Sequence, residues 1–210
     1  MLTRVFCATD RLLSVLLPLI ERIFVGVLRR LYSKLFVIRG SAGCRRFEVG
    51  TGNAFNVPVR GEGPGTLIIG SKNSFGYRPA PRQGSGRILL QARGLGAEIR
   101  IGNGCASSNN ISIIATQLIS IGDDCLIGDN VVITDSDAHE IDPVLRASGP
   151  GPSKPVFIGK NVWLGSRVMV MKGVTIGDNS VIGAMSLVNK SIPPNCVAAG
   201  NPAKVLRNLE

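Results

Sequence analysis

The sequence predicts an all-β fold, a parallel β-helix built from triangular coils, with an amphipathic helical segment before it. Aliphatic residues recur every six positions over long stretches of the chain. Glycine is abundant, with 26 residues, whereas aromatic residues make up only 5% of the chain, a mixture that suits many tight turns between small side chains. Residues 1–46 differ from the rest, because they combine apolar stretches with nine Lys or Arg and only two acidic residues.

Residues 1–46 are therefore predicted to form an amphipathic basic helix, or two helices that meet at a kink near Pro18. At about 100° per residue, four arginines fall on one side of the helix and six apolar residues on the other. They are Arg4, Arg11, Arg22 and Arg29, opposite Leu2, Phe6, Leu13, Ile20, Phe24 and Leu31. A spanning helix needs about 20 apolar residues in a row, and the longest run here is broken by Glu21. We expect residues 1–35 either to lie on an anionic membrane surface or to pack within an oligomer.

Residues 47–210 are predicted to form the β-helix domain, which begins with degenerate coils. Val49 and Ile69 are each followed by Gly and lie 20 residues apart, as do Ile101 and Ile121. This spacing equals a coil of three six-residue flats plus a slip of two residues. The Pro- and Gly-rich stretch YRPAPRQGSGR, residues 77–87, is expected to form a loop.

The six-residue period becomes strict later in the chain. Its members are Ile121, Ile127 and Ile133, and then Ile158, Leu164, Val170, Ile176, Ile182 and Val188. Neither an α-helix nor a flat strand keeps a period of six, whereas a triangular β-helix does, because every sixth aliphatic residue points inward and stacks on the neighbouring coils. Gly follows four of the last six, and Asn and Asp are common near them, as tight corners require.

Two segments break the pattern. Residues 142–156, DPVLRASGPGPSKPV, are expected to form a long loop thrown out of a coil, and loops on a rigid scaffold carry binding groups. This loop follows TDSDAHEID, which holds His139, the only histidine of the sequence. In the C-terminal tail, residues 197–210, Gly200 and Pro202 are expected to turn the chain out of the last coil, so that the tail caps the open end of the solenoid.

The composition of the chain restricts the classes of partner that it is expected to bind. The net charge is +10, and most of the excess lies in residues 1–46, which suits a polyanionic partner. Because those basic residues lie on a leucine-rich helix with no aromatic stacking platform, we expect no nucleic acid. The cysteine count is five, an odd number without a C-x-x-C pair, which predicts free thiols in a reducing cytoplasm and no metal site. We therefore expect a cytoplasmic protein, with the inner membrane as the surface available to residues 1–35.

Four stretches in one order, IGDNVVITDSDAH, VWLG, IGAMSLVNKSIPPN and AAGNPAKVLR, resemble the hexapeptide-repeat acyltransferases. Within them the chain is most similar to the sugar O-acetyltransferases of surface polysaccharide and lipopolysaccharide biosynthesis, which are related to the galactoside and maltose acetyltransferases. The resemblance covers residues 99–210, extends to 47–98 as degenerate coils, and does not reach 1–46. It implies a left-handed β-helix, a homotrimer, acetyl-CoA as co-substrate and an active site between neighbouring subunits.

The resemblance also places His139 at the catalytic position, as general base. A sugar hydroxyl is a poor nucleophile while it is protonated, and a neutral imidazole can take that proton. A base works better when an acceptor orients its other nitrogen. Asp137 is expected to be that acceptor, with Glu140 and Asp142 as alternatives, while Asp135 can instead be a corner residue.

An asparagine that contacts the acceptor near the reacting centre is also implied. The family's two asparagine positions fall on Ser108 and Asn110, so the catalytic candidate here is Asn110, with Asn109 as a substitute and a plain corner role as the other interpretation. Coenzyme contacts are implied at small residues and at basic residues that meet the nucleotide phosphates. They are Ser166, Ala184, Asn189, Lys190, Lys204 and Arg207. Trp163 is expected either to wall the thioester pocket or to fill a corner of the solenoid.

These residues predict an acetyltransferase that moves acetyl from acetyl-CoA to a hydroxyl group of a saccharide. N-acetylation of an amino sugar, including a nucleotide sugar, is the alternative reaction, because the same base can deprotonate an ammonium. A non-catalytic β-helix scaffold is the second alternative, although the intact SDAH and GNPAK argue against it. One histidine excludes a γ-class carbonic anhydrase, which needs three around zinc. Residues 1–46 are too few for the extra nucleotide domain of a nucleotidyltransferase.

Overall fold

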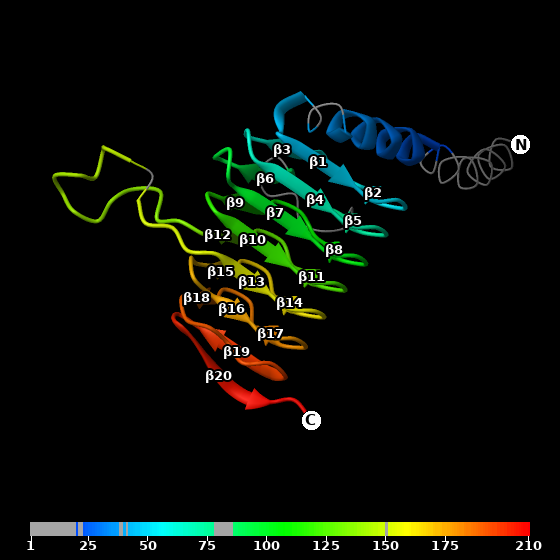
Figure 1. The fold of residues 1–210 in the computed structure, drawn as a ribbon. Helices are drawn as coiled ribbons and strands as arrows, with labels where there is room; N and C mark the ends of the chain where they lie inside the picture. Colours follow the sequence, from blue (N-terminus) through cyan, green and yellow to red (C-terminus); the bar gives the residue numbers. More distant parts are fainter. Residues whose placement is uncertain (1–19, 21–22, 38–39, 41, 78–85, 150) are drawn as a thin grey trace, which may run out of the picture.

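The computed structural model describes residues 20, 23–37, 40, 42–77, 86–149 and 151–210 and shows a solenoid of stacked triangular coils (Figure 1). Within the coils, each strand pairs in parallel with the corresponding strand of the neighbouring coil. The strands form three sheets, here called A, B and C. Each coil runs through A, B and C in turn, and we name its corners A/B, B/C and C/A. The predicted left-handed parallel β-helix is confirmed.

The three sheets have the following strands. Sheet A consists of β1 (Arg46–Val49), β4 (Thr66–Ile69), β7 (Glu98–Ile101), β10 (Leu118–Ile121), β13 (Val156–Ile158) and β16 (Thr175–Ile176). Sheet B consists of β2 (Ala54–Phe55), β5 (Ser74–Phe75), β8 (Ala106–Ser107), β11 (Leu126–Ile127), β14 (Trp163–Leu164), β17 (Val181–Ile182), β19 (Cys196–Gly200) and β20 (Ala203–Asn208). Sheet C consists of β3 (Val59–Glu62), β6 (Ile88–Ala92), β9 (Ser112–Ala115), β12 (Val132–Thr134), β15 (Met169–Val170) and β18 (Leu187–Val188).

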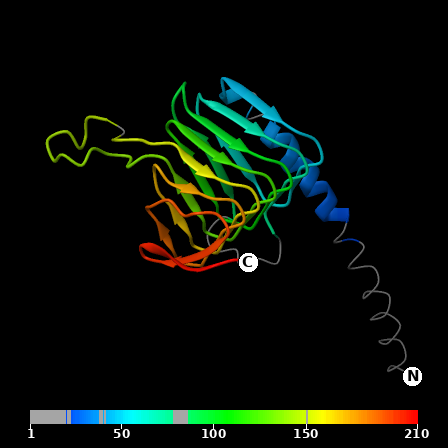
Figure 2. The same cartoon turned by 60° about the horizontal axis from the view of Figure 1, so that its bottom comes forward.

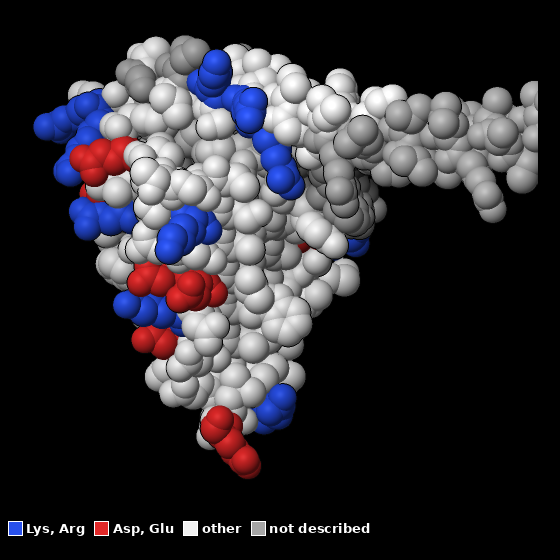
Figure 3. Space-filling model, turned by 90° about the vertical axis from the view of Figure 1, so that its right-hand side faces the viewer, with Lys and Arg blue, Asp and Glu red and all other residues white. Residues whose placement is uncertain are grey.

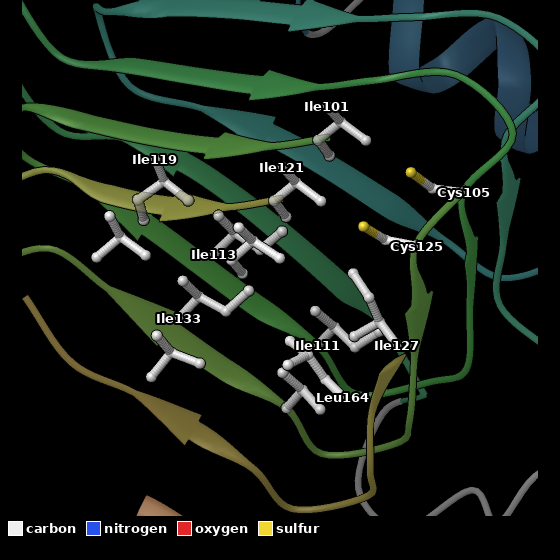
Figure 4. Packing of buried hydrophobic residues seen from close by; sticks show 14 of the residues in the cluster. Ile101, Cys105, Ile111, Ile113, Ile119, Ile121, Cys125, Ile127, Ile133 and Leu164 are labelled. Carbon is white, nitrogen blue, oxygen red and sulfur yellow. The ribbon is translucent and has the colours of Figure 1, made fainter. Parts of the chain in front are cut away.

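The six-residue period produces the core. Ile121 pairs with Ile158, Ile127 with Leu164 and Ile133 with Val170, so the predicted inward residues stack from coil to coil. Figure 4 shows the side chains of Ile121, Ile127, Ile133 and Leu164 pointing into the space between the sheets. Complete burial of an aliphatic side chain of this size contributes about 1.5–3 kcal/mol, so a column of them stabilises each contact between coils. The degenerate coils obey the same register, because Val49 pairs with Ile69.

Two buried cysteines, Cys105 and Cys125, lie side by side in this core (Figure 4). The Cys105 thiol donates to the carbonyl of Gly122 at 3.2 Å, and the Cys125 thiol donates to that of Gly159 at 3.1 Å. Cys44 and Cys196 are also free thiols, and Cys7 lies outside the described residues. The thiols of Cys105 and Cys125 therefore act as small core groups that also donate to corner carbonyls.

Corners of the coils use the left-handed backbone region, where Asn and Asp are tolerated better than other side chains. Such residues include Asn110, Asp124, Asn130, Asn161, Asn179 and Asn195, all with φ between 53° and 60°. This confirms the predicted role of Asn and Asp at tight corners.

Close approach of neighbouring coils explains one of the corner glycines. A Cβ on Gly122 would lie only 2.7 Å from the carbonyl oxygen of Gly159 in the next coil. Gly122→Ala is expected to lower the free energy of unfolding by about 1–3 kcal/mol, because the neighbouring backbone must shift. Gly149 is the matched control, since a Cβ there meets nothing within 4 Å, and Gly149→Ala should change stability by less than about 0.5 kcal/mol. Urea unfolding measures both, and equal losses would contradict this explanation.

The N-terminal helix, residues 23–37, closes the first end of the solenoid. The ring of Phe36 is fully buried and lies 5.3 Å from that of Phe47 and 5.0 Å from that of Phe55, measured between centroids. The predicted helical segment is thus confirmed for these residues, but its end packs on the solenoid of its own chain, a role that neither sequence-based alternative included. The predicted kink at Pro18 lies outside the described residues. In the part of the chain that the structure describes, no helix is long and apolar enough to cross a membrane.

The C-terminal tail adds a strand to sheet B at the second end. β20 turns back after Gly200, whose φ is 108°, and pairs antiparallel with β19. The predicted turn at GNPAK is confirmed, and sheet B therefore ends in a hairpin. Of the predicted loop 77–87, residues 78–85 lie outside the described residues.

Candidate active site

A long arm, residues 136–153, leaves the solenoid at the C/A corner after β12 (Figures 1 and 2). Its two limbs are joined at the base by an antiparallel bridge between Ser136 and Ser153 and by a hydrogen bond from the Asp137 N–H to the Pro152 carbonyl at 3.2 Å. The limbs pack closely, because a Cβ on Gly151 would lie 2.2 Å from the carbonyl oxygen of His139. The predicted loop at 142–156 overlaps this arm, but the arm begins earlier, and Val156 already belongs to β13.

Asp135 fixes the start of the arm. Its carboxylate is fully buried and accepts three backbone N–H groups, from Thr116 and Gln117 at 2.7 Å each and from Leu118 at 2.8 Å. These donors form the C/A corner of the preceding coil. Asp135 is therefore the corner residue that the sequence offered as its alternative role.

Asp137 does not contact His139 but forms an ion pair with Lys172, which follows β15 in the next coil. Both side chains are about four-fifths buried, with 20% and 22% of their surfaces exposed. The two residues that flank Ala138 reach different partners because the backbone turns there, with a φ of 66°. Within a single chain, therefore, Asp137 does not orient the imidazole, contrary to the expectation from the sequence. Asp142, an alternative, accepts instead from the Val144 N–H at 2.8 Å.

His139 is exposed on the arm, and its Nδ1 lies 3.2 Å from the carbonyl oxygen of Arg146. A carbonyl can only accept, so this contact favours the tautomer in which Nδ1 carries the proton. Nε2 then holds a free lone pair, which is the state that a general base requires. The orienting group is thus a backbone carbonyl that the sequence analysis did not identify.

The sequence analysis also did not identify Lys172 as the partner of Asp137, although the six-residue register contained a signal for it. Lys172 follows the inward Val170 by two residues, as Asp135 follows Ile133, and Ile133 pairs with Val170. The six-residue pattern alone therefore places Lys172 in the coil that follows the base of the arm, at the same corner.

Loss of the ion pair is expected to loosen the arm more than the solenoid. In Lys172→Met the Asp137 carboxylate has no partner in the described contacts, and trypsin should cleave after the exposed Arg146 several-fold faster than in the wild type. Lys172→Arg keeps the charge and is the matched control. Because the pair is partly exposed, the cost in global stability should stay near 1–2 kcal/mol. Equal cleavage rates in all three proteins would show that the pair does not hold the arm.

Asn110 lies at the B/C corner that precedes β9. Its Oδ1 accepts from the Gly86 N–H at 2.9 Å, whereas its Nδ2 is buried and has no hydrogen-bond partner in the part of the chain that the structure describes. It lines a hollow of about 340 Å³ together with Arg60 and Arg87. Asn109, the substitute, is fully buried and binds the backbone N–H and carbonyl of Tyr77 at 3.1 and 3.0 Å, so its role is structural.

His139 and Asn110 are not brought together within one chain. Asn110 precedes β9 and His139 follows β12, and these two strands pair in parallel register. The two residues therefore lie at opposite ends of sheet C, one near the B/C corner and the other at the C/A corner.

The coenzyme candidates divide between the same corners. Ser166 and Ala184 lie at the B/C corner of adjacent coils, where the Met185 N–H donates to the Ser166 carbonyl at 2.9 Å. The hydroxyl of Ser166 hydrogen-bonds to Asp129 and is the main cause of the lowered pKa of that carboxyl. Asn189 and Lys190 follow β18 and share the C/A corner with His139. Lys204 and Arg207 are exposed on β20 at the end of sheet B.

Trp163 belongs to the outer row of sheet B and is 52% exposed, so the interpretation as a corner filler is wrong. It lines a hollow of about 270 Å³ with Tyr77 and Leu126. The outward residues of this row are uncharged; they are Ala54, Ser74, Ala106, Leu126, Trp163, Val181 and Val197. Figure 3 shows the corresponding white face beside a column of charged side chains.

Comparison with known proteins agrees with this fold. Residues 155–190 match the family model "Bacterial transferase hexapeptide (six repeats)", and residues 118–135 match "Hexapeptide repeat of succinyl-transferase". The galactoside O-acetyltransferase of Escherichia coli K12 is 46% identical over 114 residues, which are 54% of this chain and 56% of that protein. The enzyme of the same name from Lactococcus lactis is 43% identical over 114 residues, 54% of this chain and 55% of that protein. The chain thus spans about half the length of these curated relatives.

Solved structures extend the similarity over more of the chain. A galactoside acetyltransferase in complex with coenzyme A has a TM-score of 0.53 and 32% identity, covering 80% of this chain and 66% of that one. The polySia-specific acetyltransferase NeuO has a TM-score of 0.56 and 25% identity, covering 80% and 81%.

Proposed function

The chain belongs to the hexapeptide-repeat acyltransferases, and from this premise we propose that it transfers acetyl from acetyl-CoA to a hydroxyl group of a saccharide. The observation that carries the proposal is the state of His139, an exposed imidazole whose Nδ1 is engaged by a backbone carbonyl. The relatives supply the reaction class, because they are named galactoside O-acetyltransferases and one is solved with coenzyme A.

In the proposed reaction, Nε2 of His139 takes the proton of the sugar hydroxyl while the oxygen attacks the thioester carbon. The carbon–sulfur bond then breaks, and the imidazolium returns the proton to the leaving thiolate. The intermediate carries a negatively charged oxygen, which needs N–H donors. The Nδ2 group of Asn110 is the candidate for this role, because it is a donor without a hydrogen-bond partner among the described residues.

We propose that the active site forms between copies of the chain, in a homotrimer. His139 and Asn110 lie at opposite ends of sheet C, so one chain alone does not complete the site. The arm has the character of a surface that another copy covers, since Ile141 and Val144 are 73% and 87% exposed. The donor would then lie along the B/C corner at Ser166 and Ala184, with Lys204 and Arg207 near its phosphates.

Mixing two inactive variants tests this arrangement. His139→Ala and Asn110→Ala, unfolded together and refolded as a mixture, should recover about a quarter of wild-type sites, because sites that join an intact His139 to an intact Asn110 arise at random. Each variant refolded alone is the control and should stay inactive. Activity that does not rise above the controls, in particles of trimer mass, would place both residues in one chain and contradict the proposal.

The reaction itself is tested by release of free CoA from acetyl-CoA in the presence of galactosides and crude surface polysaccharide. Transfer to oxygen yields an ester that mild alkali cleaves, whereas transfer to nitrogen yields an amide that survives. An alkali-labile product supports the proposal, and an alkali-stable one would replace it with N-acetylation. No sugar-dependent CoA release would contradict both.

We propose a surface polysaccharide as the acceptor. One structural relative, which is 25% identical, is named as a polySia specific acetyltransferase, and this name supports a polysaccharide acceptor. Mass spectrometry of surface glycans from cells with and without the gene should show acetylated residues in the first sample alone. Identical spectra would exclude this acceptor.

A further inference from the structure

The N-terminal helix has a second apolar face that the fold leaves uncovered. We define the apolar stripe as Ile20, Phe24, Val27, Leu31 and Leu35, which are between 41% and 60% exposed. Their spacing of three or four residues places them along one side of the helix. Phe36 and Tyr32, which pack on the solenoid, lie about 140° and 100° from the centre of the stripe around the axis by the same geometry. The helix is therefore already anchored by a different face.

The fold does not bring the stripe back onto the coils. The helix leaves the first end of the solenoid and its N-terminal part points away from the sheets (Figures 1 and 2). A large apolar side chain gains about 1.5–3 kcal/mol when it is fully buried, so five of them in one row favour a covering surface.

Charge around the stripe indicates what that surface is. Arg30 and Lys34 are exposed and flank the stripe on one side, and residues 23–37 contain no Asp or Glu. Figure 3 shows basic side chains in a row at this end of the molecule without acidic ones among them. Apolar residues that enter the headgroup region beside Lys and Arg at its edge are the arrangement of an interfacial helix. A second copy of the same helix would bring like charges together instead.

We propose that the apolar stripe lies in the surface of an anionic lipid bilayer and holds the solenoid there by its first end. Because Phe36 ties the helix to the first coils, the coils then stack away from the lipid, and the arm with His139 lies several strands of sheet C beyond the helix. Binding needs no acetyl donor, so this proposal is independent of the proposed function.

The full chain is sedimented with vesicles of phosphatidylcholine alone or mixed with phosphatidylglycerol. The wild type should bind the mixed vesicles and bind less as salt is added. Phe24→Glu combined with Leu31→Glu should weaken binding by at least about tenfold, since two apolar anchors are lost. Arg30→Gln combined with Lys34→Gln should remove most of the preference for phosphatidylglycerol. Leu95→Glu makes the same kind of change at a 68% exposed leucine on another turn and should bind as the wild type does.

Three results would overturn the proposal. The first is a wild type that does not sediment with the mixed vesicles. The second is a stripe variant that binds as strongly as the wild type. The third is a stripe variant whose molar mass falls in light scattering while its binding is unchanged, because the stripe would then be a contact between subunits. Circular dichroism of each variant shows that the loss is not one of folding.

Discussion

His139→Ala is expected to lower kcat for acetyl transfer by about 10²- to 10⁴-fold, the usual contribution of a general base. The KM for acetyl-CoA should change little, because the residues proposed to hold the donor are Ser166, Ala184, Lys204 and Arg207, and the imidazole is proposed to act on the acceptor hydroxyl. Stability should change by less than about 0.5 kcal/mol, since the side chain is exposed and contacts one carbonyl. Steady-state kinetics and thermal unfolding on the same preparation measure the three quantities.

Glu140→Gln is the matched control for this prediction. Glu140 follows His139 on the arm and was one of the sequence candidates for orienting it, so a change there tests whether any charge on the arm has the same effect. It should keep most of the wild-type kcat. Added imidazole should restore part of the activity of His139→Ala, because a small base can occupy the vacated space. A His139→Ala protein that turns over at the wild-type rate would refute the proposed mechanism.

Asp135→Ala is expected to produce the largest loss of stability, about 3–5 kcal/mol. The carboxylate is fully buried and is the acceptor for three backbone N–H groups, all within 2.8 Å. Without it, those donors are left unpaired inside the corner from which the arm starts. Because whole domains are stable by only about 5–15 kcal/mol, the variant should unfold at a much lower urea concentration.

Asp178→Ala removes a carboxylate from a different corner and is the control. Asp178 is exposed and accepts one backbone N–H in the preceding coil, from Lys160 at 2.8 Å. Its loss should cost less than about 1 kcal/mol. If the two variants unfold at the same urea concentration, the number of satisfied donors does not explain the role of Asp135.

The solenoid could be predicted because its signal is local and repeated. Ile121, Ile127 and Ile133 each represent one flat of a coil, and any sequence with that period must stack the same positions. The presence of a loop was also visible, since a run such as GPGPSKP cannot continue the repeat, but its predicted limits, 142–156, differ from those of the arm. The degenerate coils could also be predicted, because Val49 and Ile69 have the same spacing as Ile101 and Ile121.

The partners of His139 could not be predicted in the same way. Asp137 is near His139 in sequence, but the turn at Ala138 separates their side chains, and alanine has no intrinsic preference for that backbone region. The contact from Nδ1 to the Arg146 carbonyl depends on how two limbs of an irregular arm pack, which no repeat encodes. The division of the coenzyme candidates between two corners could have been predicted from the sequence, because Ser166 follows an inward residue of sheet B and Asn189 follows an inward residue of sheet C.

The two ends of the solenoid differ in shape, and this has a consequence for the behaviour of the protein at high concentration. A stack of parallel strands with bare termini is a template on which identical molecules can polymerise into fibres. Here the ring of Phe36 is buried against the coils at one end of the solenoid. At the other end, β20 runs in the opposite direction to the strands before it. A newly arriving molecule therefore finds no matching parallel strand in sheet B, which keeps the particles discrete.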